Sequence, residues 1–95
     1  MQEQKSKKIV FTFGRFQPPT SGHQLLIDKV VDVANKKKAE HRIYASPGSD
    51  PKRNPLSYNN KIKYMKRMFP NANIVKNASM KNPFIVAQSL SDEGY

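Results

Sequence analysis

Short apolar runs alternate along this chain with longer stretches in which apolar residues recur every three or four positions. Residues 9–13 form a β-branched and aromatic run that ends at Gly14, which is typical of a buried strand. Residues 41–46 and 73–75 predict a second and a third strand. The pattern therefore predicts a sheet whose strands are separated by helices.

The first two helices are predicted from apolar spacing and from their ends. Residues 22–37 carry apolar side chains at helical intervals and lysines in the last turn, where the helix dipole favours cations. The second helix follows Ser57, a good N-cap, and runs to about Phe69, just before Pro70. One face of it should be buried, because its apolar residues repeat at intervals of four, three and four: Tyr58, Ile62, Met65 and Phe69. We expect this aromatic and methionine stripe, with Met68, to be core rather than a cofactor site.

The third helix completes a β-α-β-α-β-α order. Asn82 should cap it, with Pro83 at its first position, and it should end near Gly94. We expect three of its side chains to face inward: Phe84, Ala87 and Leu90. Alternation of this kind predicts a three-layer, Rossmann-like α/β fold with a parallel sheet and right-handed crossovers.

Length and composition limit the chain to one small domain. With 95 residues and no cysteine, it has neither disulfides nor thiolate metal sites to stabilise a modest core. Residues 1–8 are polar and predict a disordered lead-in, and residues 9–95 predict a partial domain. There is no signal-peptide core and no apolar run near the roughly 20 residues that span a bilayer, so we expect a cytoplasmic protein.

The formal net charge of +10 has two interpretations. It favours polyanionic partners, namely nucleotides, phosphates or nucleic acid. We expect no membrane partner, because no apolar run is long enough to span a bilayer. Alternatively, the lysines only solvate helix faces, since several occupy positions that we expect to face water: Lys36, Lys37, Lys38, Lys61, Lys63 and Lys66. His41 is expected to be an exposed strand residue.

The loop after the first strand is the strongest candidate for chemistry, because ligands of open α/β sheets bind beyond the carboxyl ends of the strands. Gly14 allows a sharp turn and a close approach to a ligand, and Arg15 offers a forked donor for phosphate. Thr20 and His23 lie three residues apart where the chain enters a helix, with Gly22 between them. The helix N-terminus adds unpaired backbone N–H groups, so the loop predicts a phosphate site.

The string Gly-Arg-Phe-Gln-Pro-Pro-Thr-Ser-Gly-His at residues 14–23 resembles the (His/Thr)-x-Gly-His motif of the nucleotidylyltransferase superfamily. It is most similar to nicotinamide-mononucleotide adenylyltransferase-like and phage nucleotidyltransferase-like members. Residues 53–57, Arg-Asn-Pro-Leu-Ser, look like the basic loop that opens the family's second helix. The resemblance covers nearly the whole chain and indicates the N-terminal half of that fold.

The resemblance implies transfer of an adenylyl or cytidylyl group from a nucleoside triphosphate to a phosphate-bearing acceptor, with release of pyrophosphate and usually with Mg²⁺. His23 would contact the triphosphate, with Thr20 replacing the first histidine of the stricter motif. Lys52 or Arg53 would reach over the site as a mobile cation. The remaining nucleotide-binding residues would be Gly14, Arg15, Phe16, Gln17 and Gly22. Asp50 is the one nearby carboxylate that could meet a metal.

Two departures from the family leave other interpretations open. No Ser/Thr-rich segment ending in arginine, the family's second phosphate motif, follows the first, so the isolated chain should turn over little substrate. In the family's strand order of 3-2-1-4-5 the first strand pairs with a fourth strand, for which these residues offer no candidate. Residues 9–13 would then be an edge strand, which should recruit a second copy or a partner chain. The alternatives to an enzyme are a non-catalytic structural protein that retains half of the fold and a nucleic-acid-binding module.

Overall fold

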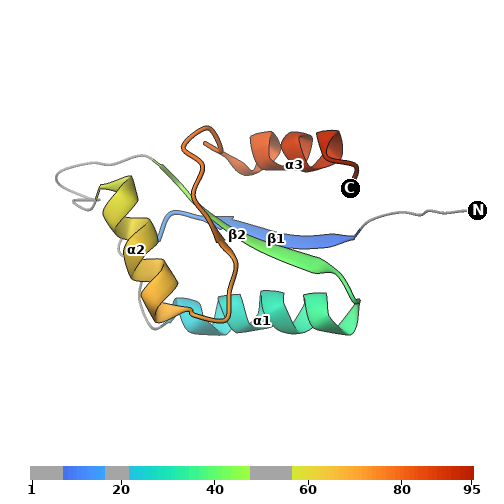
Figure 1. The fold of residues 1–95 in the computed structure, drawn as a ribbon, viewed down its shortest axis with the longest axis horizontal. Coiled ribbons are helices and arrows are strands. Elements are labelled where there is room, and N and C mark those ends of the chain that lie inside the picture. Colours follow the sequence, from blue (N-terminus) through green and yellow to red (C-terminus); the bar gives the residue numbers. More distant parts are fainter. Residues whose placement is uncertain (1–7, 17–21, 48–56) are drawn as a thin grey trace, which may run out of the picture.

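The computed structural model describes residues 8–16, 22–47 and 57–95, which form a parallel sheet with helices on both sides (Figure 1). The strands are β1 (Ile9–Gly14), β2 (Glu40–Ala45) and β3 (Ile74–Val75). The helices are α1 (His23–Lys36), α2 (Tyr58–Met68) and α3 (Pro83–Asp92). The predicted β-α-β-α-β-α order and the Rossmann-like α/β class are confirmed. The predicted lead-in lies outside the described residues except for Lys8.

The sheet has the order β1-β2-β3, and both pairings are parallel. β1 pairs with β2 along its whole length, from Ile9 opposite Glu40 to Gly14 opposite Ala45. The contact of β2 with β3 is short, with Ile43 opposite Ile74 as one of its two pairs. Within the described residues β1 therefore lies at the end of the sheet, as predicted. Its pairing with a partner chain stays a prediction.

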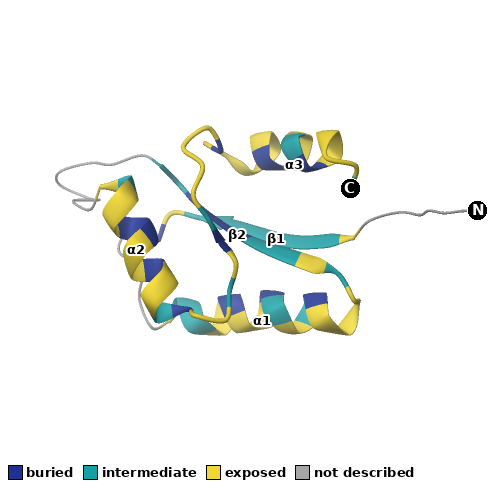
Figure 2. Cartoon of the chain, in the orientation of Figure 1, coloured by how far each residue is buried: buried dark blue, intermediate teal, exposed yellow. Residues whose placement is uncertain are grey.

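Two apolar clusters cover the two faces of the sheet (Figure 2). Side chains of a strand alternate between faces, so Ile43 and Ala45 of β2 point to one side and Tyr44 to the other. The first cluster joins β2 to α1 and α2, chiefly through Ile27, Val30, Ile62, Met65 and Phe69. The second joins it to α3 and the loop before it through Met80, Val86 and Leu90. The result is three layers, and the core role of the α2 stripe is confirmed.

The predicted helix starts at Ser57 and Asn82 are confirmed in atomic detail. The Ser57 hydroxyl accepts a hydrogen bond from the Asn60 backbone N–H at 3.2 Å, and the Asn82 side chain accepts one from Ile85 at 2.9 Å. Each bond satisfies a backbone donor that has no partner inside the helix. These caps fix where α2 and α3 begin, and so how they meet the sheet.

The predicted inward face of α3 is partly wrong. Leu90 is buried, but Phe84 is 85% exposed and Ala87 is also exposed, whereas Val86 is fully buried. Val86 and Leu90 are four residues apart, so they share one face, and that face meets the sheet. The helix is apolar around much of its first two turns, and for that reason spacing alone does not reveal which stripe is buried.

Side chains from β2 and α2 hold the short β3 and its flanks in place. His41 is not a simple exposed residue: its Nε2 accepts a hydrogen bond from the Asn73 backbone N–H at 2.9 Å. The Tyr58 hydroxyl accepts another from Asn77 at 2.7 Å. Burial raises the Tyr58 pKa, and the bond from Asn77 opposes that shift. These bonds compensate for a strand of only two residues.

The assignment of the α3 face predicts opposite responses to two substitutions. Val86→Ala removes two buried methyl groups and should lower the free energy of unfolding by about 2 kcal/mol. Phe84→Ala removes a larger but exposed side chain and should change it by less than about 0.5 kcal/mol. Urea unfolding followed by circular dichroism measures both. A larger loss for Phe84→Ala than for Val86→Ala would show that α3 meets the sheet through its other face.

Candidate phosphate-binding site

The candidate site begins where β1 and β2 end together. Gly14 is the last residue of β1 and lies opposite Ala45 in the sheet register. The Gly14 carbonyl accepts a hydrogen bond from the Ser46 backbone N–H at 2.8 Å, so the segments that follow β1 and β2 leave the sheet side by side. This is the carboxyl edge of a parallel sheet, where α/β proteins place their ligands.

Phe16 anchors the loop that follows β1. Its side chain is 2% exposed and belongs to the core cluster beneath α1 and α2. Its backbone has a φ of 50°, in the left-handed region that bulky residues rarely adopt. A Cβ on Gly14 would lie 3.0 Å from the Phe16 ring, so glycine at this position makes room for the aromatic side chain. Only the backbone of Phe16 is therefore placed to meet a ligand.

His23 is the first residue of α1 and packs against this anchor. The His23 and Phe16 rings lie 4.7 Å apart between centroids, with an angle of 55° between their planes. Gly22 precedes it as the N-cap, and no side chain caps this helix end. The helix dipole favours an anion at this end of α1. The structure brings together Gly14, Arg15, Phe16, Gly22 and His23, with Arg15 exposed.

Lys61 reaches this loop from α2, contrary to the expectation that it faces water. Its residue exposure is 0%, and its Nζ donates a hydrogen bond to the Arg15 carbonyl at 2.8 Å. Lys61 precedes the buried Ile62 and lies one turn before the buried Met65, at the border of the buried face of α2. From that border its long aliphatic stem extends inward, and its ammonium group lies next to the backbone of the loop.

The electrostatic environment of Lys61 is unfavourable for an isolated charge. Burial lowers its pKa below the ordinary lysine value. Among residues 8–16, 22–47 and 57–95, no carboxylate forms an ion pair with it, and the Arg15 carbonyl is its only hydrogen-bond acceptor. An ammonium group has three N–H donors, so two are left for a further acceptor. A buried cation with one neutral partner is stabilised by an incoming anion.

Sequence reasoning missed Lys61 because its signal is weak. In the sequence it is one of several lysines in a basic helix. The only sign was its place next to the buried stripe of Ile62, Met65 and Phe69, and that sign does not separate a lysine that extends into solvent from one that extends inward. The direction of the Lys61 side chain depends on the Arg15 carbonyl, which lies 46 residues away in the sequence.

Four other predicted site residues lie outside the described residues: Gln17, Thr20, Lys52 and Arg53. Asp50 lies outside them as well. Across the parts of the chain that the structure describes, no three His, Asp or Glu side chains form a group that could hold a metal ion. The described residues around the loop are cationic or neutral and do not fit Mg²⁺, so we assign no step to this ion.

Comparison of the chain with protein family models, with curated proteins and with solved structures found no match. The helices within the described ranges are too short or too polar to cross a bilayer. The interpretation of the site therefore rests on its geometry and on the motif at residues 14–23.

The isolated charge of Lys61 predicts an unusual response to Lys61→Met. Methionine fills a similar volume without a charge, so at neutral pH the variant should be as stable as the natural chain or more so. Because burial lowers the Lys61 pKa, its contribution to stability is present above the unfolded value of 10.5 and is lost as the pH falls through the folded value. The natural chain should therefore gain stability relative to Lys61→Met as the pH rises in the alkaline range. Urea unfolding over a pH series measures this difference.

The matched control is Lys66→Met on the exposed face of the same helix. It removes the same charge, and its difference from the natural chain should not change with pH in this way. A loss of several kcal/mol for Lys61→Met at neutral pH, with no pH-dependent difference, would contradict the isolated buried charge.

Proposed function

We propose that this chain is a nucleotide-binding domain of the nucleotidylyltransferase type, and that its loop after β1 holds the phosphates of a nucleoside triphosphate. The observation that carries the proposal is the buried Lys61, whose one hydrogen bond with the described residues goes to the Arg15 carbonyl and whose ammonium group an anion would reach once its surroundings open. A purely structural role would not need a charge here, since an apolar side chain would fill the space at lower electrostatic cost. A phosphate supplies the missing counter-charge.

The neighbouring groups support a phosphate rather than another anion. The uncapped N-terminus of α1 presents backbone N–H groups, and His23 begins that helix. Arg15 is exposed on the same loop, and its planar guanidinium suits two phosphate oxygens. Donors from α1, α2 and the loop between β1 and α1 would act together here, because Lys61 bonds to the loop at Arg15 and His23 packs against Phe16. A triphosphate has enough oxygens to engage all of them.

The proposed reaction is nucleotidyl transfer. An oxygen of the acceptor phosphate attacks the α-phosphorus, a new P–O bond forms, and the bond to the β-phosphate bridging oxygen breaks to release pyrophosphate. The protein contributes position and charge: His23 and Lys61 would donate to the phosphate oxygens, and the first N–H groups of α1 would stabilise the charge on the transferring group. Thr20, Gln17, Lys52 and Arg53 keep the roles proposed from the motif. Whether the base is adenine or cytosine is decided by the experiment below.

Titration with ATP and with CTP, followed by amide chemical shifts, tests the proposal. We expect shifts that include the loop and helix start, at Gly14 to Phe16 and Gly22 to His23, because these backbones lie next to the proposed phosphate position. His23→Ala and Lys61→Met should each weaken binding roughly tenfold or more, since each removes a donor to a charged group. The stronger nucleotide identifies the base.

Lys66→Met again serves as the control and should bind nucleotide within about twofold of the natural chain, because an exposed and distant charge contributes little. The proposal fails if millimolar ATP and CTP leave the amides of residues 14–16 and 22–23 unchanged. It also fails if Lys66→Met weakens binding as much as Lys61→Met does, since the effect would then be general electrostatic attraction.

A further inference from the structure

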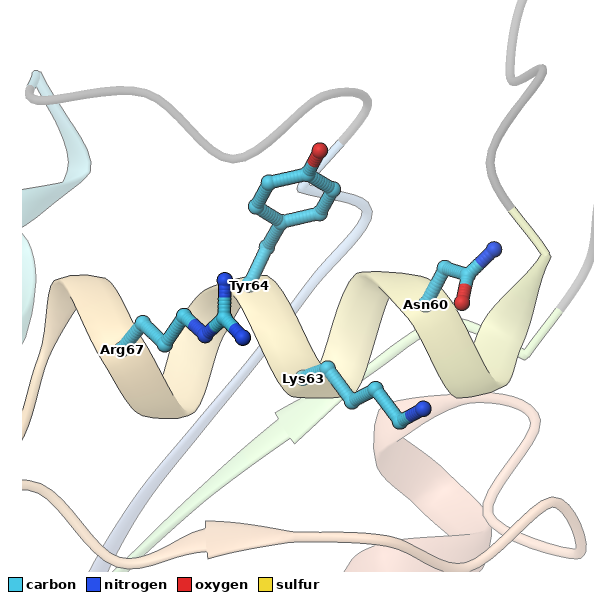
Figure 3. A pocket seen from close by; sticks show the side chains of 4 residues that line it. All are labelled: Asn60, Lys63, Tyr64 and Arg67. Atoms are coloured by element: carbon cyan, nitrogen blue, oxygen red, sulfur yellow. The ribbon is translucent and has the colours of Figure 1, made fainter.

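A group of polar and basic side chains lies on the outer face of α2, away from its buried stripe. Asn60, Lys63, Tyr64 and Arg67 line a pocket of about 290 Å³ (Figure 3). Their positions differ by three or four residues, so they lie along one side of the helix. In Figure 3 the Tyr64 ring stands away from the helix, with Arg67 further along α2 in one direction and Asn60 in the other. All four side chains belong to a face that is open to solvent.

Tyr64 and Phe84 are the two aromatic residues that are more than half exposed among the described residues. Tyr64 is 51% exposed, and it makes no hydrogen bond or ring contact with the described residues. Its neighbours Lys63 and Arg67 form no ion pair with any carboxylate that the structure describes. The whole of α2 contains no acidic residue, and Lys66 extends the same basic surface. The face thus combines an accessible aromatic ring with cations that have no carboxylate partner among the residues that the structure describes.

We propose that this face of α2 binds single-stranded nucleic acid, with one base stacked on Tyr64 and the adjoining phosphates held by Lys63 and Arg67. Stacking on an aromatic ring between basic side chains is the arrangement that holds single strands, because every base has a flat face and every link carries a charge. Asn60 can hydrogen-bond the edge of the stacked base. The net charge of +10 makes the whole chain attractive to a polyanion.

A single strand fits this surface better than a duplex does. In a duplex the bases are stacked on each other and cannot lie on Tyr64, so the ring would contribute nothing. A free mononucleotide would use the ring but carries only its own phosphate, whereas the cations extend along the helix from Lys63 to Lys66 and Arg67. The face therefore recognises several consecutive phosphates together with one base.

The test is the fluorescence anisotropy of a labelled oligothymidylate over a range of salt concentrations. Tyr64→Leu should weaken binding roughly fivefold to a hundredfold, while Tyr64→Phe should bind like the natural chain because its ring can still stack. Lys63→Gln/Arg67→Gln should reduce the slope of log K against log salt by about 0.7 for each phosphate that the variant no longer neutralises. The control variant Lys29→Gln/Lys37→Gln removes the same charge from α1 and its C-cap, and it should leave the affinity for the oligonucleotide almost unchanged. Amide shifts on adding the oligonucleotide should fall within α2.

Three results would overturn the proposal. Equal weakening by the α2 and α1 double variants would mean that only overall charge attracts the oligonucleotide. Duplex that binds as tightly as single strand would exclude stacking on Tyr64. A mononucleotide that displaces the oligonucleotide at similar concentrations would make the pocket a small-ligand site. The result is independent of the nucleotide site, because the variants leave His23 and Lys61 unchanged and should keep the amide shifts of residues 14–16 and 22–23 on addition of ATP.

Discussion

The hydrogen bond from the Lys61 ammonium to the Arg15 carbonyl connects the core of this domain to its candidate site. It joins α2 to the loop after β1 across 46 residues of sequence, and it does so with a charge that burial disfavours. The loop backbone is also fixed at Phe16, which takes a left-handed conformation and places its ring in the core. The two contacts together hold the loop at the carboxyl edge of the sheet, next to the start of α1.

This arrangement explains why a small sheet can still present a defined site. β3 contributes only two residues, and the layers are tied together by side chains: His41 to Asn73 beside β3, and Tyr58 to Asn77 beyond it. Next to His41 on β2, Arg42 donates two hydrogen bonds to the Glu93 carboxylate, at 2.8 and 2.9 Å, and fastens the end of α3. These side-chain contacts therefore support the strands that carry the candidate site.

The sequence predicted the elements well because their signals are local. The apolar runs located β1 and β2, and the caps Ser57 and Asn82 set the starts of α2 and α3. Phe16 and His23 lie close together, as expected for residues near the two ends of one short loop, whereas their role in a site stays a prediction. Three features depend on contacts between distant segments and were not foreseen: the inward course of Lys61, the left-handed backbone of Phe16 and the burial of Val86 in place of Phe84. The exposure of Tyr64 was not predicted either, because the exposure of each residue of α2 depends on which stripe of the helix meets the sheet.

Titration of Lys61 itself tests the proposal that this buried ammonium group binds an anion. With lysine labelled at the ε-carbon and the Lys61 resonance assigned through Lys61→Met, the pKa can be followed by NMR with and without pyrophosphate. We predict that Lys61 titrates below 10.5 in the free chain, because burial disfavours its charge. Pyrophosphate should raise the pKa of Lys61, because an anion stabilises the ammonium form. A Lys61 that titrates at its ordinary value and does not respond to pyrophosphate would contradict the proposal.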